Sequence, residues 1–145
     1  IRRSLRSYIE LARENPEIAI FGIPHPKRSC IYDEAIAVIQ HKKADSQKVE
    51  NQIKRYASEG YPKKHGLIET NFLIFNLHHP LTEKIFELWS SEVSNESHRD
   101  QLSLNYILWK LNAKWMPLMH EGQSLRDCSN FAYFGHGKNS GYRSP

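Results

Sequence analysis

The chain has 145 residues, which suffice for one compact domain and are too few for two domains of ordinary size. Its composition, 39% hydrophobic and 25% charged residues, is typical of a globular protein and excludes a disordered chain. No apolar run approaches the roughly 20 residues that span a bilayer, so we expect no transmembrane segment in this chain. The sequence starts at Ile1 without an initiator Met, and we expect it to begin inside a longer reading frame.

The net charge of +4 is unevenly distributed along the chain. Residues 1–64 contain thirteen Lys or Arg and eight Asp or Glu, whereas residues 65–145 contain seven and eight. A basic half favours anionic partners such as nucleic acid, phosphorylated small molecules or acidic lipid. A solvated surface is the simpler explanation for most of these scattered charges. The two cysteines are too few for a disulfide framework or a zinc site, so we expect free thiols.

Hydrophobic spacing and capping residues predict that helices and strands alternate. In the first half they predict a helix over residues 4–14, a buried strand over 17–23, and helices over 31–43 and from Ser46 to Gly60. Ser29 and Ser46 are the expected N-caps of the last two helices.

In the second half, the apolar residues of 67–77 predict a central strand or strand pair. A helical stripe follows, formed by Leu81, Ile85, Leu88 and Trp89. Ser97 and Asp100 resemble a capping box, which predicts a helix that extends to Leu111. Residues 122–145 are rich in Gly, Ser and Asn and predict a loop-rich tail.

This alternation predicts an α/β fold in which a mixed sheet is flanked by helices. In open α/β sheets, ligands bind beyond the carboxyl ends of the strands. The two candidate ends are residues 24–28 and 76–79. The first contains His25, Lys27 and Arg28 before a helix start, an arrangement that suits phosphate. A solvated basic turn is the competing interpretation.

Two further clusters of polar residues are difficult to explain as structure alone. Glu69, Thr70 and Asn71 interrupt an apolar stretch, where they either line a polar cleft or occupy a strand bend. Arg99 and Gln101 flank Asp100 at an expected helix start, and capping accounts only for the aspartate.

The tail adds two candidate ligand-binding residues, His136 and Lys138. Glycines flank His136 and would allow the backbone to approach a ligand closely. Histidine can bind a metal and lysine can neutralise phosphate, although a tail without a ligand is an equally common case. His78 and His79 are adjacent on an expected strand, so we expect only a structural role for them.

Three segments in order, residues 25–35, 59–71 and 99–103, resemble one known family. Their sequences are His-Pro-Lys-Arg-Ser-Cys-Ile-Tyr-Asp-Glu-Ala, a segment that begins Glu-Gly-Tyr-Pro and ends Gly-Leu-Ile-Glu-Thr-Asn, and Arg-Asp-Gln-Leu-Ser. The family is the glycosyltransferase-like one long known as a domain of unknown function, whose plant members are tied to mucilage and cell-wall polysaccharides. The resemblance covers roughly residues 20–115 and implies a single glycosyltransferase-like domain over 1–145.

More distantly, these motifs are similar to those of retaining transferases with the GT-A fold, a Rossmann-like mixed sheet. The resemblance implies that Asp100 and Gln101 act as catalytic residues at the donor sugar. It implies that a late histidine, His136, binds Mn²⁺ or Mg²⁺. The remaining candidates would bind substrate, and they are His25, Lys27, Arg28, Glu69, Thr70, Asn71, Arg99 and Lys138.

One departure from the GT-A pattern is the absence of an Asp-x-Asp motif, which usually holds the metal in these enzymes. In the family, the acidic motif and the first nucleotide-binding strands lie upstream of the segment that resembles residues 1–30. We therefore expect this chain to be the C-terminal portion of a domain that lacks its N-terminal strands.

The sequence thus predicts a glycosyltransferase that uses a nucleotide-sugar donor and a glycan or polysaccharide acceptor. The alternatives are a non-catalytic module that binds an anionic ligand, with Trp89, Trp109 and Trp115 available for stacking, or an inactive transferase fragment. The resemblance disfavours a nucleic-acid partner. For the compartment, we expect the cytoplasm in a bacterial source and the Golgi lumen in a plant-type parent.

Overall fold

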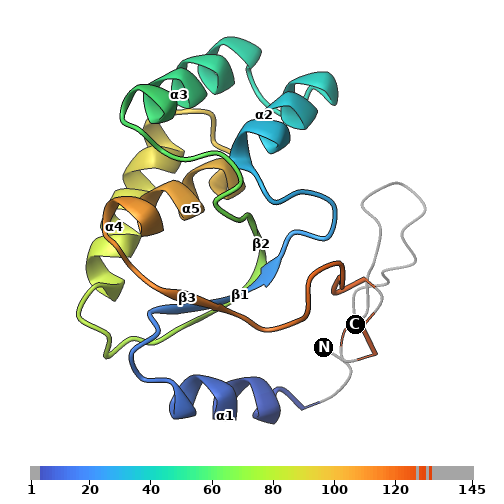
Figure 1. The fold of residues 1–145 in the computed structure, drawn as a ribbon, viewed down its shortest axis with the longest axis vertical. Helices are drawn as coiled ribbons and strands as arrows, with labels where there is room; N and C mark the ends of the chain where they lie inside the picture. The colour runs from blue at the N-terminus through green and yellow to red at the C-terminus, as the bar shows by residue number, and fades with distance from the viewer. Residues whose placement is uncertain (1–3, 127, 130, 132–145) are drawn as a thin grey trace, which may run out of the picture.

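The computed structural model describes residues 4–126, 128, 129 and 131 (Figure 1). This part forms helices and a small sheet, in the order α1 Arg6–Glu14, β1 Ile20–Pro24, α2 Ile31–Gln40, α3 Ser46–Ser58, β2 Ile68–Phe75, α4 Thr82–Asn95, α5 Asp100–Lys110 and β3 Trp115–Pro117. Every helix and both longer strands occur where the sequence predicts them. The short strand β3 was not predicted. None of the helices in these residues is long and apolar enough to cross a membrane.

The sheet is mixed, as expected, with the strand order β2-β1-β3. Among the described residues β1 is the central strand and β2 is an edge strand, so the prediction of a central strand over 67–77 is wrong in its place in the sheet. Strand β1 pairs antiparallel with β2, so that Ile20 faces Phe75 and Ile23 faces Glu69. It pairs parallel with β3 on its other edge. The antiparallel pairing places residues 24–28 and 76–79 at opposite ends of the sheet, so the two candidate strand ends do not border one site.

The pairing of β1 with β2 is interrupted by a bulge. Opposite the single residue Gly22, strand β2 carries residues 70–73. A Cβ atom at Gly22 would lie 2.6 Å from Ile68 Cγ2, so the close approach of the two strands requires glycine. Thr70 and Asn71 therefore lie in a strand bulge, which was one of the two interpretations of this polar segment.

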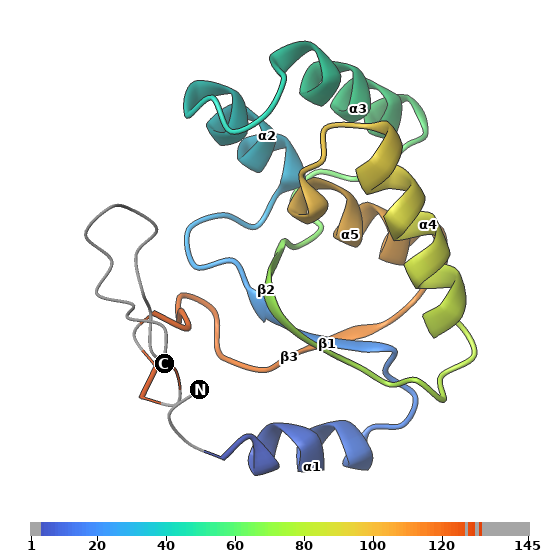
Figure 2. The ribbon, with the colours of Figure 1, turned by 180° about the vertical axis from the view of Figure 1, so that it is seen from behind.

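The sheet separates two apolar clusters, and helices cover both of its faces (Figures 1 and 2). On one face, Ile20 of β1 packs with Ile31, Tyr56, Ile85 and Leu104 from α2, α3, α4 and α5. On the other face, Phe21 packs with Tyr8 and Leu11 of α1 and with Leu118 and Leu125 after β3. The side chains of Trp89, Trp109 and Trp115 pack against the first cluster, which gives them a core role.

Three of the helix N-caps differ from those predicted. Helix α2 has Cys30 at its N-cap, without a side-chain capping bond, and not Ser29. Helix α3 is capped by Asp45, whose Oδ1 accepts from the Lys48 backbone N–H at 2.8 Å, and not by Ser46. Helix α5 has Arg99 at its N-cap, and the Ser97 hydroxyl instead donates to Gln52 Oε1 at 2.6 Å. The capping box predicted at Ser97 is therefore wrong, because a residue of α3 engages the hydroxyl.

A polar network joins α3, α4 and α5 at the surface. Arg55 Nη2 donates to both carboxylate oxygens of Glu92, at 2.8 and 2.7 Å. Glu59 Oε2 accepts from the Tyr106 hydroxyl at 2.6 Å and from Lys110 Nζ at 2.8 Å. These hydrogen bonds lower the pKa of Glu59 to about 2, and the bond from Lys110 has the largest effect. The network ties the three helices together.

Candidate functional site

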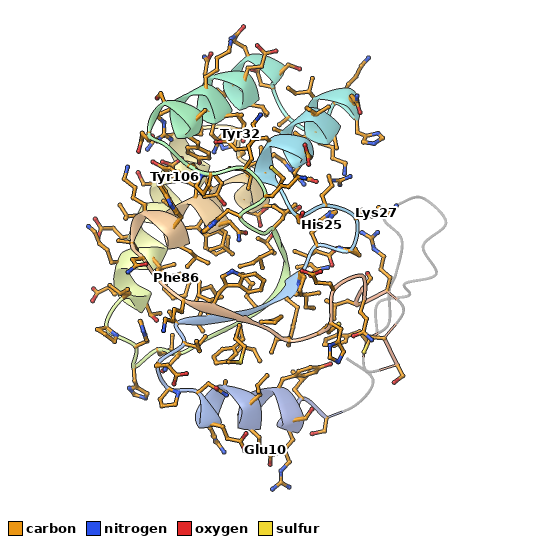
Figure 3. All side chains as sticks on the ribbon, in the orientation of Figure 1. Glu10, His25, Lys27, Tyr32, Phe86 and Tyr106 are labelled. Atoms are coloured by element: carbon orange, nitrogen blue, oxygen red, sulfur yellow. The ribbon has the colours of Figure 1, made fainter. Side chains whose placement is uncertain are left out.

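Two hollows open on either side of residues 117–122, which follow β3. The first, which we call the basic cleft, has a volume of about 570 Å³ and lies beyond the end of β1. Its walls include the β1–α2 loop, the start of the 66–69 segment and the residues after β3, among them Lys27, Arg28, Gly66, Trp115, His120 and Glu121. Figure 3 shows His25 and Lys27 on this loop, on the opposite side of the sheet from Glu10 of α1.

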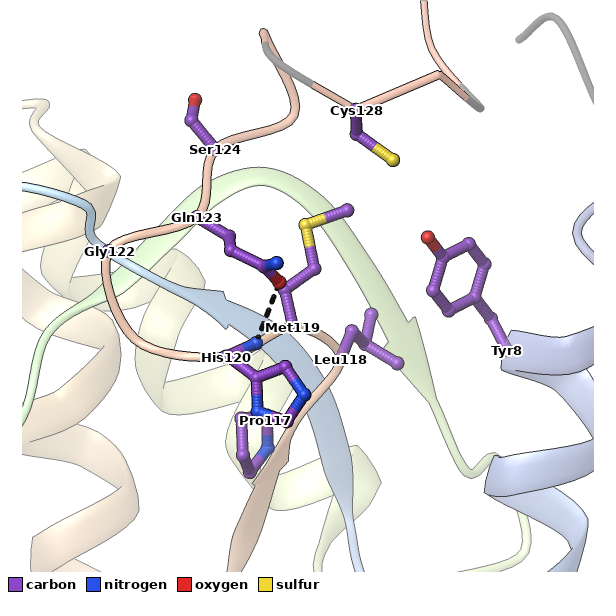
Figure 4. A pocket seen from close by; sticks show the side chains of 9 residues that line it. All are labelled: Tyr8, Pro117, Leu118, Met119, His120, Gly122, Gln123, Ser124 and Cys128. Atoms are coloured by element: carbon purple, nitrogen blue, oxygen red, sulfur yellow. Dashed lines mark hydrogen bonds between the residues drawn. The ribbon is translucent and has the colours of Figure 1, made fainter.

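The second hollow has a volume of about 560 Å³ and lies between α1 and the chain after β3. Figure 4 shows Tyr8 of α1 directed toward Met119 and Cys128 across this hollow. It shares Pro117, Met119, His120 and Gly122 with the basic cleft. The segment 117–122 is therefore a wall between two adjacent hollows.

The backbone holds the ring of His25 in the loop. Its Nδ1 accepts hydrogen bonds from the backbone N–H groups of Lys27, at 3.2 Å, and Arg28, at 3.0 Å. An accepting Nδ1 carries no proton, which places the proton of the neutral ring on Nε2. Burial lowers the pKa of His25 despite the opposing effect of Glu34. The ring thus stays uncharged at neutral pH, and the loop offers Lys27 and Arg28 as cations.

Arg28 is held by a carboxylate that sequence reasoning did not assign to the site. Its Nε donates to Oε2 of Glu34, and His25 Nε2 lies 3.8 Å from the same oxygen. Glu34 is on the first turn of α2 and only 2% exposed. Lys27, by contrast, is exposed at the mouth of the cleft.

Helical spacing in the sequence places Glu34 on the buried face of α2, although its position near the helix start also suits an exposed carboxylate. Ile31, Ala35 and Val38 are buried on the inner face of α2, and Glu34 falls on the same face by helical spacing. A carboxylate on an inward face needs a cationic or hydrogen-bonding partner. Glu34 also lies in the first turn of α2, where the helix dipole favours a carboxylate, but this effect explains an exposed carboxylate and not a buried one.

The segment 66–69 brings the three sequence motifs together. On one side, Gly66 N–H donates to the Ser29 carbonyl at 3.0 Å, and Leu67 O accepts from His25 N–H at 2.8 Å. On the other side, Ile68 N–H donates to Asn105 Oδ1 of α5 at 2.9 Å. The β1–α2 loop and α5 thus bond to neighbouring residues of one short segment, although they are far apart in the sequence.

Glu69 is buried on the sheet face that carries α1. It is the cross-strand partner of Ile23, so both side chains lie on the same face. Glu69 Oε1 is 4.0 Å from Arg126 Nη2, while Oε2 is buried without a hydrogen-bond partner. Arg126 also acts electrostatically on His25, which links Glu69 to the loop of the basic cleft. Thr70 is half-buried and Asn71 is exposed in the bulge.

The third motif forms the N-terminal end of α5. Asp100 accepts from the Gln101 backbone N–H through Oδ1, at 2.8 Å, and its carbonyl accepts from Trp89 Nε1 at 3.0 Å. Gln101 lies one turn before Asn105, on the helix face that meets the start of β2. The side-chain Nε2 of Gln101 is buried and has no hydrogen-bond partner. The same holds for Nε of Arg99.

The buried polar atoms without partners coincide with these motifs. In the described part, four buried side-chain N or O atoms have no hydrogen-bond partner, and three belong to Glu69, Arg99 and Gln101. The fourth is the Tyr61 hydroxyl. Such atoms cost free energy, and folded proteins retain few of them without a reason. Ordered water or a bound ligand with hydroxyl and charged groups would supply the missing partners.

The tail candidates His136 and Lys138 lie outside the described residues. Residues 4–126, 128, 129 and 131 contain no group of three His, Cys, Asp or Glu side chains that could hold a metal ion. The carboxylates of Glu34 and Glu69 face Arg28 and Arg126, arrangements that suit ion pairs. The described residues alone therefore do not fit a metal centre.

The comparison with protein families identifies the class to which this fold and these motifs belong. The model of the TOD1/MUCI70 glycosyltransferase-like domain matches residues 6–133, which is most of the chain. The chain belongs to this family of glycosyltransferase-like domains, as its three motifs predicted. The comparisons with curated proteins and with solved structures gave no match.

Proposed function

We propose that this domain transfers a sugar from a nucleotide-sugar donor to a glycan or polysaccharide acceptor. Membership in a glycosyltransferase-like family supports the general class of reaction. The observation that carries the proposal is the coincidence of the family motifs with buried polar atoms that lack partners, on Glu69, Arg99 and Gln101. A site built to hydrogen-bond many hydroxyl groups leaves such atoms unpaired when the ligand is absent.

In this proposal, the basic cleft binds the diphosphate of the donor. Lys27 and Arg28 provide two cations at its wall. The first turn of α2 begins directly after this loop, and its backbone N–H groups add positive potential toward an anion. The same groups would stabilise the negative charge that develops on the diphosphate when the bond to the sugar breaks.

The sugar would bind at the edge of the sheet beside the start of β2, because Glu69 is on the face that carries α1 and α5 covers the other face. Glu69 and Gln101 have buried polar atoms available for hydroxyl groups, and Arg99 has a buried N–H donor. Thr70 and Asn71 follow Glu69 in the bulge, and in this proposal their side chains bind the same ligand. Asp100 would orient the sugar or the acceptor while its own Oδ1 is fixed by the Gln101 backbone.

We also propose that the complete enzyme uses a divalent cation. Transferases of the GT-A type use Mn²⁺ or Mg²⁺ to neutralise the leaving diphosphate. His136 and Lys138 are the candidates to face the metal and the diphosphate.

The proposal is tested by incubating the full chain with a panel of nucleotide sugars and glycan acceptors, with and without Mn²⁺ or Mg²⁺. The expected result is release of the nucleoside diphosphate from at least one donor, measured by chromatography against a sample without protein. No release from any donor contradicts transferase activity. A parallel titration with an oligonucleotide examines the alternative binding module, for which a steep decrease in affinity with salt is expected.

A further inference from the structure

Glu34 is the buried carboxylate behind the cationic wall of the basic cleft. It is only 2% exposed, and Arg28 Nε donates to its Oε2. His25 Nε2 lies 3.8 Å from the same oxygen and 3.3 Å from Arg28 Nη2. Oε2 of Glu34 therefore faces the side chains of both His25 and Arg28.

The contact with Glu34 determines what Arg28 can present to a ligand. A guanidinium has five N–H donors in one plane, and fixing Nε fixes the direction of the others. Only 27% of the Arg28 side chain is exposed, so its outer N–H groups reach the cleft from a restrained position. Restraining a long side chain before binding lowers the entropy cost of ordering it when the ligand binds.

We infer that Glu34 is a positioning residue, which aims the guanidinium of Arg28 at an anionic group, the diphosphate of the donor, in the basic cleft. This inference rests on the proposed function, because it assigns the anion to the donor. Glu34 itself does not contact the ligand, since it is buried and does not line the cleft.

Removal of the Glu34 carboxylate should change the affinity for an anion in the direction opposite to that expected from charge alone. A carboxylate near an anion site repels the anion, so its removal should tighten binding if charge alone matters. If Glu34 aims Arg28, its removal should weaken binding, although the net positive charge of the protein increases. The direction of the change thus separates the two roles.

The test uses isothermal titration calorimetry of the full chain with UDP and with inorganic pyrophosphate as probes. Glu34→Gln should raise the dissociation constant about threefold to tenfold, through loss of a charge-assisted contact. Asp33→Asn is the matched control, because Asp33 is exposed on the same helical turn and loses the same charge. It should leave binding within about twofold of the wild type.

A second variant keeps the role of Glu34 testable even if Glu34→Gln fails to fold. Glu34→Asp retains the charge but shortens the side chain, so electrostatics predicts no change while positioning predicts weaker binding. Thermal melting of each variant confirms that it is folded. In the Arg28→Ala background, Glu34→Gln should have no further effect on binding, because Glu34 acts through Arg28.

The outcomes separate the inference from the proposed function. Unchanged or tighter binding by Glu34→Gln, or equal weakening with and without Arg28, overturns the role of Glu34. Wild-type protein that binds pyrophosphate but not UDP contradicts the nucleotide donor, and the pyrophosphate titrations then decide the role of Glu34. Wild-type protein that binds neither probe overturns both.

Discussion

Asn105 of α5 accepts a hydrogen bond from the backbone N–H of Ile68, the first residue of β2, at 2.9 Å. Both residues are buried. This bond connects the helix that carries Arg99, Asp100 and Gln101 to the strand that carries Glu69. The relative position of two sequence motifs thus depends on one side-chain amide.

Asn105→Ala should destabilise the domain, because it leaves the Ile68 N–H buried without an acceptor. We expect the free energy of unfolding to fall by roughly 1–3 kcal/mol, measured by urea denaturation. Asn95→Ala is the control, since Asn95 is exposed and bonds only to Ser91. Equal losses from the two substitutions would contradict a structural role for the Asn105 bond.

Gln101→Leu should weaken binding of the donor without lowering the free energy of unfolding. The amide Nε2 of Gln101 is buried without a partner, so an apolar side chain of similar size should preserve or increase the free energy of unfolding. Binding of the nucleotide sugar should nevertheless weaken about tenfold, through loss of a hydrogen bond to the ligand. Thermal melting and calorimetry with the same donor measure the two effects.

Gln52→Leu is the matched control for that prediction. Gln52 is also buried, but it donates to the Tyr56 hydroxyl at 2.8 Å and accepts from the Ser97 hydroxyl at 2.6 Å. Its replacement should lower the free energy of unfolding by roughly 1–3 kcal/mol. If Gln101→Leu destabilises the domain as much, Gln101 has a structural role and the binding prediction fails.

The stability of the helical layer should depend on pH through Glu59. Hydrogen bonds from Lys110 and Tyr106 lower its pKa from 4.5 to about 2. A depressed carboxyl pKa stabilises the folded state above the unfolded-state value, and this contribution is lost as the pH falls from about 4.5 to about 2. Glu59→Gln should therefore be less stable than the wild type at pH 7, with a difference that narrows over this window.

Denaturation at a series of pH values measures the difference. Glu50→Gln serves as the control, because Glu50 is exposed and its cationic partner, Lys54, is 3.7 Å away. That substitution should change stability by less than about 1 kcal/mol at every pH. A difference between Glu59→Gln and wild type that stays constant down to pH 2 would show that the carboxylate does not contribute through its charge.

The positions of the candidate segments in the fold could be predicted because their signals are local. Pro16 and Pro24 bound the apolar run that became β1, so the position of the basic loop after it followed directly. Polar residues within the apolar segment 67–77 were consistent with a polar cleft or a strand bend, and the structure has a bulge at residues 70–73.

The remaining features depend on tertiary partners that one sequence does not reveal. The hydroxyl of Ser97 bonds to Gln52 of another helix, which local capping rules do not include. The strand β3, Trp115–Pro117, is too short for periodicity and exists because β1 offers it a free edge. The antiparallel pairing of β1 with β2, which separates the two candidate strand ends, is likewise a tertiary property.

The central claim is that the basic cleft binds a nucleoside diphosphate, and calorimetry of the full chain with UDP and GDP, with and without Mn²⁺, tests it most directly. We predict a dissociation constant below about 1 mM for at least one of them. Lys27→Ala should weaken this binding and reduce its dependence on salt. Lys48→Ala, an exposed change on α3, should not. Absence of binding at millimolar nucleotide, with and without Mn²⁺, would contradict the claim.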